Sequence, residues 1–185
     1  MLLSKFCKKI KVEDFEAAAL PHLDDVYRAA RRLTRNRAEA EDLVQDVYLQ
    51  AWQSFHRFEP GTNCRAWLFQ ILFYKLHYHR RKWFRLVRES ESALENLAYE
   101  PPPPEHIRDV EILSALEKIL PVYRETILLI DVEEFSYRET GFILKVPVGT
   151  VMSRLSRGRK LLRTALVEVA DSYGIKNVRE KVGHG

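Results

Sequence analysis

Residues 136–163 read SYRETGFILKVPVGTVMSRLSRGRKLLR, and this stretch predicts two helices joined by a tight turn. Ser136 and Glu139 have the spacing of a capping box, in which each side chain bonds the other residue's backbone amide, so a helix begins near Ser136. The residue before Pro147 avoids the helical region, whereas proline itself suits the first turn of a new helix. The second helix extends to about Ala170, and the pair has the helix-turn-helix pattern.

The second helix of this pair is predicted to carry a basic surface. Five basic residues and no acidic one lie between positions 146 and 163. A helix fits the major groove of DNA, where Arg pairs with guanine, Ser bonds several base edges and the remaining cations bind phosphate. The pattern therefore favours a duplex-DNA surface over a solvated basic face. At the spacing i, i+3, i+4 and i+7 the exposed stripe holds Ser153, Ser156, Arg157 and Lys160, flanked by Arg154, Arg159 and Arg163.

The first half of the chain also has helical periodicity. Residues 12–33 have apolar side chains at helical spacing, although Pro21 is expected to restart the helix. From Ala38 to Phe55 the apolar residues give one broad helix face. This segment has four acids and no Lys or Arg, and its opposite face holds Glu39, Asp42, Gln45, Asp46 and Gln53.

A further helix is expected from about Cys64 to Arg88. It follows a turn at Glu59-Pro60-Gly61, and Thr62 or Asn63 can cap it. The helix begins with aromatic and aliphatic residues and ends strongly basic. The basic residues of its later part are Lys75, Arg80, Arg81, Lys82, Arg85 and Arg88, interleaved with His77, Tyr78, His79, Trp83 and Phe84.

Four consecutive prolines, Pro101 to Pro104, divide the chain. Proline cannot continue a helix and favours an extended conformation, so we expect a linker at 91–106. The predicted fold class is therefore all-α, with two small helical domains at 12–90 and 107–172 and the helix-turn-helix in the second. That second domain also has helical patterns over 107–120 and 122–132.

Composition excludes several classes of protein. The net charge of +4 is too small to indicate nucleic-acid binding without the charge distribution described above. Two distant cysteines, Cys7 and Cys64, predict neither a disulfide framework nor a metal site. No signal peptide or membrane-spanning stretch is recognisable, which predicts a cytoplasmic protein without membrane insertion. The absence of a phosphate loop or a nucleophile motif argues against an enzyme, and no cofactor is expected.

Four motifs, in order along the chain, resemble the extracytoplasmic-function group of sigma-70-type sigma factors. Residues 41–48 (EDLVQDVY) resemble region 2.2 of that family, and residues 67–71 (WLFQI) resemble the start of region 2.3. Residues 120–125 (LPVYRE) resemble region 4.1. Residues 146–151 (VPVGTV) with 153–155 (SRL) resemble the promoter-reading helix of region 4.2. Each motif alone is weak, but four in order across nearly the whole chain are specific.

The resemblance implies an alternative sigma factor that binds core RNA polymerase and directs transcription from particular promoters, with an anti-sigma factor as a further partner. It implies docking on the largest catalytic subunits of the polymerase through Asp42, Gln45, Asp46 and Leu49. It implies contacts to the −10 element from Trp67, Tyr74, Tyr78, Arg80 and Arg81, because rings stack on unpaired bases and cations follow phosphates. The loop at 57–63 resembles one that captures a flipped base. Contacts to the −35 duplex are implied for Thr150, Ser153, Arg154, Ser156, Arg157 and Lys160.

Some positions depart from the family pattern. Met152 replaces a frequent basic residue, while Tyr74 and Tyr78 replace small polar ones, so promoter preferences do not transfer from relatives. Gly141 and Gly158 stand where Ala is usual, and Gly141 in a helix predicts close approach of the next helix. An ordinary helix-turn-helix regulator of duplex DNA remains an alternative, although it gives no reason for an acidic helix followed by a basic aromatic one.

Overall fold

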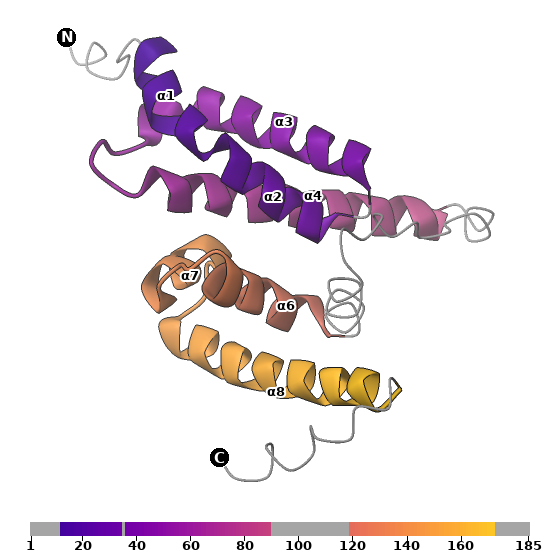
Figure 1. Cartoon of the computed structure of the whole chain (residues 1–185). Coiled ribbons are helices and arrows are strands. Elements are labelled where there is room, and N and C mark those ends of the chain that lie inside the picture. Colours follow the sequence, from indigo (N-terminus) through magenta and orange to yellow (C-terminus); the bar gives the residue numbers. More distant parts are fainter. Residues whose placement is uncertain (1–11, 35, 90–118, 173–185) are drawn as a thin grey trace. The chain divides into compact units, whose positions relative to one another are not determined.

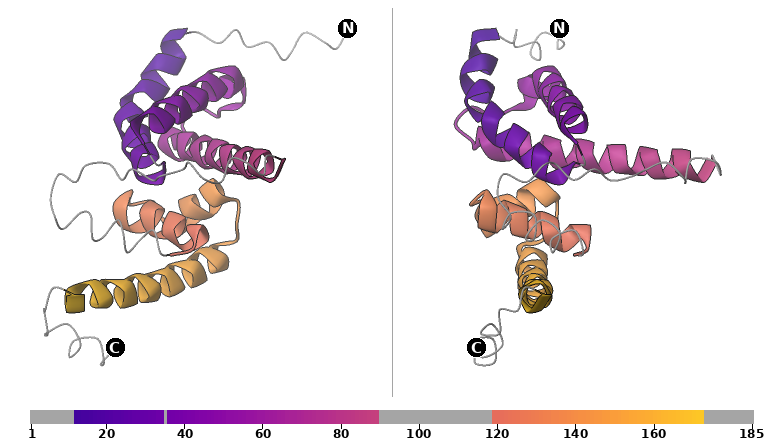
Figure 2. Two further views of the ribbon diagram at one scale, coloured as in Figure 1. Left: turned by 90° about the vertical axis from the view of Figure 1, so that its right-hand side faces the viewer. Right: turned by 45° about the vertical axis from the view of Figure 1, so that its right-hand side comes forward.

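A computed structural model describes residues 12–34, 36–89 and 119–172 of the 185-residue chain, with side chains to position 82 in the first half and to 167 in the second. In these ranges every regular element is helical, which confirms the all-α prediction (Figures 1 and 2). The chain divides into two compact units. The predicted linker at 91–106 and nearly all of the helix predicted at 107–120 lie outside the described residues, so the linker bounds stay a prediction.

The N-terminal unit contains the three helical segments expected from the sequence. Pro21 interrupts the first of them as predicted, because a 3₁₀ turn at Leu20–His22 separates two α-helices. In Figure 1 the last three α-helices of this unit lie alongside one another, and each of the three contacts the other two. The α-helices are α1 (Val12–Ala19), α2 (Leu23–Leu33), α3 (Arg37–Ser54) and α4 (Cys64–Glu89).

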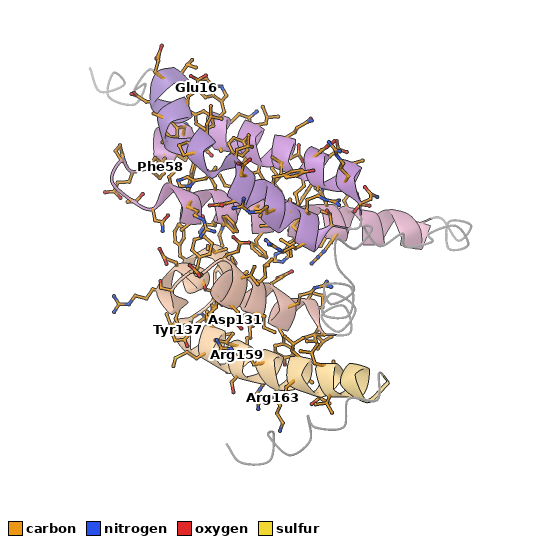
Figure 3. The ribbon with its side chains drawn as sticks, in the orientation of Figure 1. Glu16, Phe58, Asp131, Tyr137, Arg159 and Arg163 are labelled. Carbon is orange, nitrogen blue, oxygen red and sulfur yellow. The ribbon has the colours of Figure 1, made fainter. Side chains whose placement is uncertain are left out.

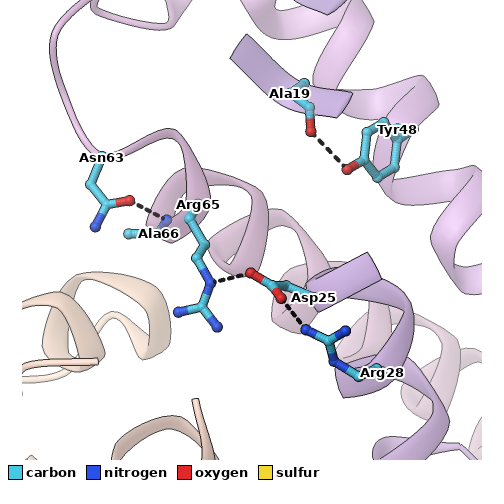
Figure 4. A network of polar contacts seen from close by, with 7 residues as sticks. All are labelled: Ala19, Asp25, Arg28, Tyr48, Asn63, Arg65 and Ala66. Carbon is cyan, nitrogen blue, oxygen red and sulfur yellow. Dashed lines mark hydrogen bonds and ion pairs between the residues drawn. The ribbon is translucent and has the colours of Figure 1, made fainter. Parts of the chain in front are cut away.

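Local hydrogen bonds explain where α3 and α4 begin. The Asn36 side chain accepts from the Glu39 amide at 2.9 Å, which caps α3. Between the helices, Gly61 adopts a φ of 89°, a conformation that favours glycine. Of the two candidate caps of α4, Asn63 has that role, since its side chain accepts from the Ala66 amide at 3.0 Å (Figure 4).

The core of this unit is aliphatic and aromatic. Its largest fully buried side chains include Leu43 on α3 and Phe69 and Phe73 on α4. An ion pair also ties α4 to α2, because Arg65 Nε donates to Asp25 Oδ2 at 2.8 Å while Arg28 binds the other carboxylate oxygen (Figure 4). The unit is therefore a packed helical scaffold with rigidly placed exposed faces.

The C-terminal unit, as far as it is described, begins at residue 119. Helix α6 packs against α8, and a Cβ at Gly158 of α8 would lie 3.0 Å from Ile127 Cδ1 and 3.2 Å from Tyr123 Cβ. Gly158 thus allows close packing of α6 against α8 at a position where Ala is usual in the family. The elements are α6 (Pro121–Ile127), a π-helical segment (Leu128–Val132), α7 (Tyr137–Leu144) and α8 (Val148–Ser172).

Helices α7 and α8 and the turn between them confirm the predicted helix-turn-helix, and local geometry explains where α7 begins and ends. Ser136 and Glu139 form the capping box at the start of α7, with bonds of 3.2 Å and 2.9 Å. Helix α7 ends because Lys145 is left-handed, with φ 54° and ψ 47°. The sequence had placed this end at the residue before Pro147, but the chain has already left the helix one residue earlier.

Gly141 has a related role in the turn. A Cβ there would lie 2.9 Å from the Val146 carbonyl oxygen and 3.7 Å from the Val148 side chain. The predicted close approach is therefore real, but the nearest atom belongs to the turn rather than to the second helix. The Val146 amide also donates to the Gly141 carbonyl at 3.0 Å, which closes the turn tightly.

Candidate polymerase-docking and nucleic-acid surfaces

The stripe predicted on α8 is exposed as expected. Ser153, Ser156, Arg157 and Lys160 all face solvent, whereas Val151 and Leu155 are buried on the other side of the helix. Pro147 accepts from the Thr150 and Val151 amides, so Thr150 lies in the first turn of the helix and is half-buried. The side chains of this stripe project from a helix end that is fixed by the core beneath it.

Two polar contacts distinguish the roles of residues around this stripe. The Ser153 hydroxyl donates to the Thr150 carbonyl at 3.0 Å, which leaves its oxygen able to accept a bond from a base. Arg159 binds Asp131 through two nitrogens, and this hydrogen bond raises the pKa of the guanidinium (Figure 3). Arg159 is thus held to the π-helical segment, whereas Arg163 is exposed and Arg154 half-buried.

The predicted docking face of α3 is also exposed. Asp42 and Gln45 face solvent, and Leu49, an apolar residue, is 55% exposed. Asp46 is partly exposed, and its Oδ2 atom lies 2.8 Å from the His79 Nε2 atom of α4. Sequence reasoning missed this partner, because nothing in the spacing of the two residues indicates that they meet.

The residues predicted to contact the −10 element on α4 separate into two groups. Tyr74 and Tyr78 are 53% and 48% exposed, and Arg81 is exposed as well, so these three are accessible. Arg80 instead donates to the Leu33 carbonyl at the end of α2, at 3.2 Å. A cation at a helix C-terminus also has a favourable interaction with the helix dipole, so Arg80 has a structural contact in addition to its predicted one.

Trp67, the fifth of these residues, belongs to an aromatic cluster. Its ring lies 5.0 Å from that of Phe58 and 6.2 Å from that of Phe55. Phe55 in turn stacks on Phe58 and meets Phe15 edge-on, with centroids 5.5 Å and 5.2 Å apart. Trp67 is half-buried there, so it supports the loop that starts at Phe58, labelled in Figure 3, more directly than it presents a ring to DNA.

Neither a metal site nor a membrane-spanning helix is found among the described residues. No group of three or more His, Cys, Asp or Glu side chains in them is placed to hold a metal ion. Cys64 is a free cysteine, and burial raises the pKa of its thiol. None of the described helices is long and apolar enough to span a membrane.

Comparison with known proteins decides the family. Residues 19–85 match the family description Sigma-70 region 2, and residues 109–162 match Sigma-70, region 4. The ECF RNA polymerase sigma factor EcfG of Rhodopseudomonas palustris is 35% identical over 162 residues, which are 85% of this chain and 86% of that protein. The chain belongs to the extracytoplasmic-function sigma factors.

Two further similarities agree with this assignment. The ECF RNA polymerase sigma factor SigE of Mycolicibacterium smegmatis is 36% identical over 154 residues, covering 80% of this sigma factor and 59% of that longer protein. The Bartonella quintana sigma factor RpoE, solved in complex with the anti-sigma factor NepR, is 35% identical with a TM-score of 0.73. That match covers 84% of this chain and 98% of the solved one.

These findings confirm the resemblance drawn from the four motifs. The chain is an alternative sigma factor, a transcription initiation factor that binds core RNA polymerase and directs promoter-specific initiation, and not an enzyme. They support this function and not the free-standing helix-turn-helix regulator.

Proposed function

We propose that this sigma factor docks on core polymerase through the exposed face of α3, formed by Asp42, Gln45, Asp46 and Leu49. The observation that carries the proposal is the combination of an acidic rim with a 55% exposed leucine on a helix whose other face is buried in the core. An exposed apolar side chain among carboxylates suits a protein interface, where burial of the apolar group adds affinity and the charges orient the partner.

The two DNA surfaces divide the promoter between them. The stripe of α8, with Thr150 and Arg154 beside it, reads the −35 duplex, because a rigid helix with exposed Ser and Arg side chains fits the major groove. Tyr74, Tyr78 and Arg81 on α4 contact the opened −10 element, with Trp67 and Arg80 shaping that surface from within the fold. The domains extend over 12–90 and 107–172, joined by the linker at 91–106.

A protein partner other than polymerase limits the activity. The solved relative from Bartonella is in complex with an anti-sigma factor, and a domain pair joined by a proline-rich linker suits control by a partner that binds both domains. We place the protein in the cytoplasm, where core polymerase and promoter DNA are found.

Run-off transcription tests the proposal directly. Purified core polymerase is supplied with a library of randomised promoters, with and without the sigma factor. We expect protein-dependent transcripts that share a −35 and a −10 motif at fixed spacing. Tight binding of the free protein to a duplex site, without any activation of the core enzyme, would contradict it.

Substitution of the docking face isolates the first step. Asp46→Arg places a positive charge where the proposed interface has a negative one. We therefore expect affinity for core polymerase to fall at least tenfold, which corresponds to about 1.4 kcal/mol. Titration of labelled core polymerase in the absence of DNA measures this. Unchanged affinity of both Asp46→Arg and Leu49→Ala would show that the face lies elsewhere.

A further inference from the structure

Asp46 and His79 form a contact between two helices with different proposed roles. The His79 Nε2 and Asp46 Oδ2 atoms are 2.8 Å apart, although the residues are 33 positions apart in the sequence. The side chains of His79 and Asp46 remain 42% and 39% exposed. An aspartate that a partner can reach is therefore held by a neighbouring helix.

The stability of the fold gives no strong reason for this pair. Exposed ion pairs contribute little to folding, because water screens the charges and holding two side chains in one geometry costs entropy. Helices α3 and α4 pack against each other and already bury large apolar residues such as Val47 and Leu72. Removal of the imidazole should consequently leave the unit folded.

The contact has a clear geometric effect on Asp46. A surface aspartate samples several staggered χ1 rotamers, but a bond at Oδ2 selects the rotamer that reaches His79. Because the carboxylate stays partly exposed, it can meet a cationic group of a partner while held in this rotamer. A side chain that is already ordered loses less entropy on association, which strengthens binding.

The position of His79 on α4 adds a second consequence. Its sequence neighbours Tyr78 and Arg80 belong to the segment proposed to contact the −10 element, and the Tyr78 ring lies 6.2 Å from the imidazole. The Asp46 contact thus joins the docking helix to the DNA-contacting segment.

We infer that His79 is a positioning residue for polymerase docking, which holds the Asp46 carboxylate in the orientation that the core enzyme binds. The inference rests on the proposed docking face of α3. Loss of the imidazole leaves the charge of Asp46 unchanged but frees its rotamer, so the expected effect on core affinity is smaller than that of reversing the charge.

Titration of core polymerase with the full-length sigma factor tests this role. We expect His79→Ala to weaken core binding roughly three- to tenfold. His79→Gln, whose amide can still donate to Asp46, should restore most of the affinity. His56→Ala is the matched control. His56 is also exposed in the N-terminal unit, and the bonds of its ring within the described residues are to local partners, the Gln53 carbonyl and Arg57. Its loss should leave core affinity unchanged.

A double-mutant cycle separates positioning from a direct contact. If His79 acts through Asp46, His79→Ala should have no further effect in an Asp46→Ala background. Three outcomes would each overturn the inference. His79→Ala binds core polymerase with wild-type affinity, it loses affinity equally in both backgrounds, or its loss of affinity follows a fall in the thermal midpoint of unfolding. If Asp46→Arg and Leu49→Ala also bind normally, the docking face itself is wrong; if they bind weakly, only the role of His79 fails.

Discussion

The Tyr48 hydroxyl bonds a backbone carbonyl at the point where the first helix is interrupted. At the interruption by Pro21, the Leu23 amide bonds the Leu20 carbonyl, and the Ala19 carbonyl accepts from the Tyr48 hydroxyl at 3.0 Å (Figure 4). We expect Tyr48→Phe to destabilise the N-terminal unit by about 1 kcal/mol, since it leaves a carbonyl without this partner. All three tryptophans lie between positions 52 and 83, so tryptophan fluorescence during urea unfolding reports this unit alone.

The same tyrosine predicts a pH dependence of stability. Burial, with smaller contributions from Cys64, Asp25 and Asp24, raises the pKa of Tyr48 above its ordinary value of 10.0. The unfolded chain loses the phenolic proton near pH 10 while the folded chain keeps it. The free energy of unfolding therefore keeps its full value below pH 10. It falls as the pH rises further, by up to about 1.4 kcal/mol per pH unit.

Unfolding by urea at several pH values between 8 and 11 checks this slope. Tyr48→Phe should lose the part of the slope that Tyr48 contributes. Tyr74→Phe, which removes a hydroxyl from an exposed ring, should retain the wild-type slope. If the free energy of unfolding of Tyr48→Phe fell with pH as steeply as that of the wild type, a group other than Tyr48 would cause the pH dependence.

At the scale of residues, the sequence predicted which side chains are exposed but not which side chains of distant helices meet. Periodicity placed the α8 stripe and the acidic face of α3 on solvent, because burial follows the helical repeat. It did not reveal that Arg80 binds the Leu33 carbonyl or that His79 meets Asp46, since these contacts depend on how helices distant in sequence pack. The N-cap Asn36 could have been found, because Asn36 and Glu39 have the capping-box spacing.

At the scale of elements, the turn between α7 and α8 depends on the lack of a side chain at Gly141. A Cβ at this position would approach the Val146 carbonyl to 2.9 Å, so the backbone of the turn must shift. We expect Gly141→Ala to destabilise the C-terminal unit by about 1 kcal/mol, because this strain exceeds the gain in helix propensity. Differential scanning calorimetry measures the change.

Gly149→Ala is the control for that substitution. Gly149 lies in the first turn of α8, and its added Cβ would meet no atom within 4 Å apart from its chain neighbours and the nearby backbone of its own helix. Alanine should therefore be neutral or stabilise the unit by up to about 1 kcal/mol. Equal effects of the two substitutions would show that the close approach at Gly141 has no energetic weight.

The elements themselves were largely predictable from local signals. The interruption at Pro21, the capping box at Ser136 and the turn before α4 all follow from residues within a few positions of each other. The left-handed Lys145 was not predicted, because a lysine gives no local sign that it will adopt a conformation typical of glycine. The π-helical segment at Leu128–Val132 likewise has no signature in the sequence.

At the scale of the whole molecule, the three proposed surfaces occupy different helices, so their functions should be separable. Asp46 is on α3, Tyr74 on α4 and Arg157 on α8. The order of the four motifs predicted the family, and the matches at 19–85 and 109–162 confirm it. The bases that each surface prefers are not predictable, because specificity depends on individual side chains such as Met152 and Tyr78 where the chain departs from the family pattern.

Arg157→Ala tests this separation at the −35 element. Because Arg157 is exposed at the centre of the α8 stripe, its removal should leave core affinity unchanged and reduce transcription from the selected promoter by roughly five- to 150-fold, equivalent to about 1–3 kcal/mol for a lost base contact. It should also relax base preference at one −35 position. Arg163→Ala removes the same charge from the flank of the helix, so it should weaken all promoters alike and reduce the salt dependence. Holoenzyme run-off on randomised −35 sequences distinguishes the two, and an unaltered base preference in Arg157→Ala would mean that α8 lies in the groove with a different face.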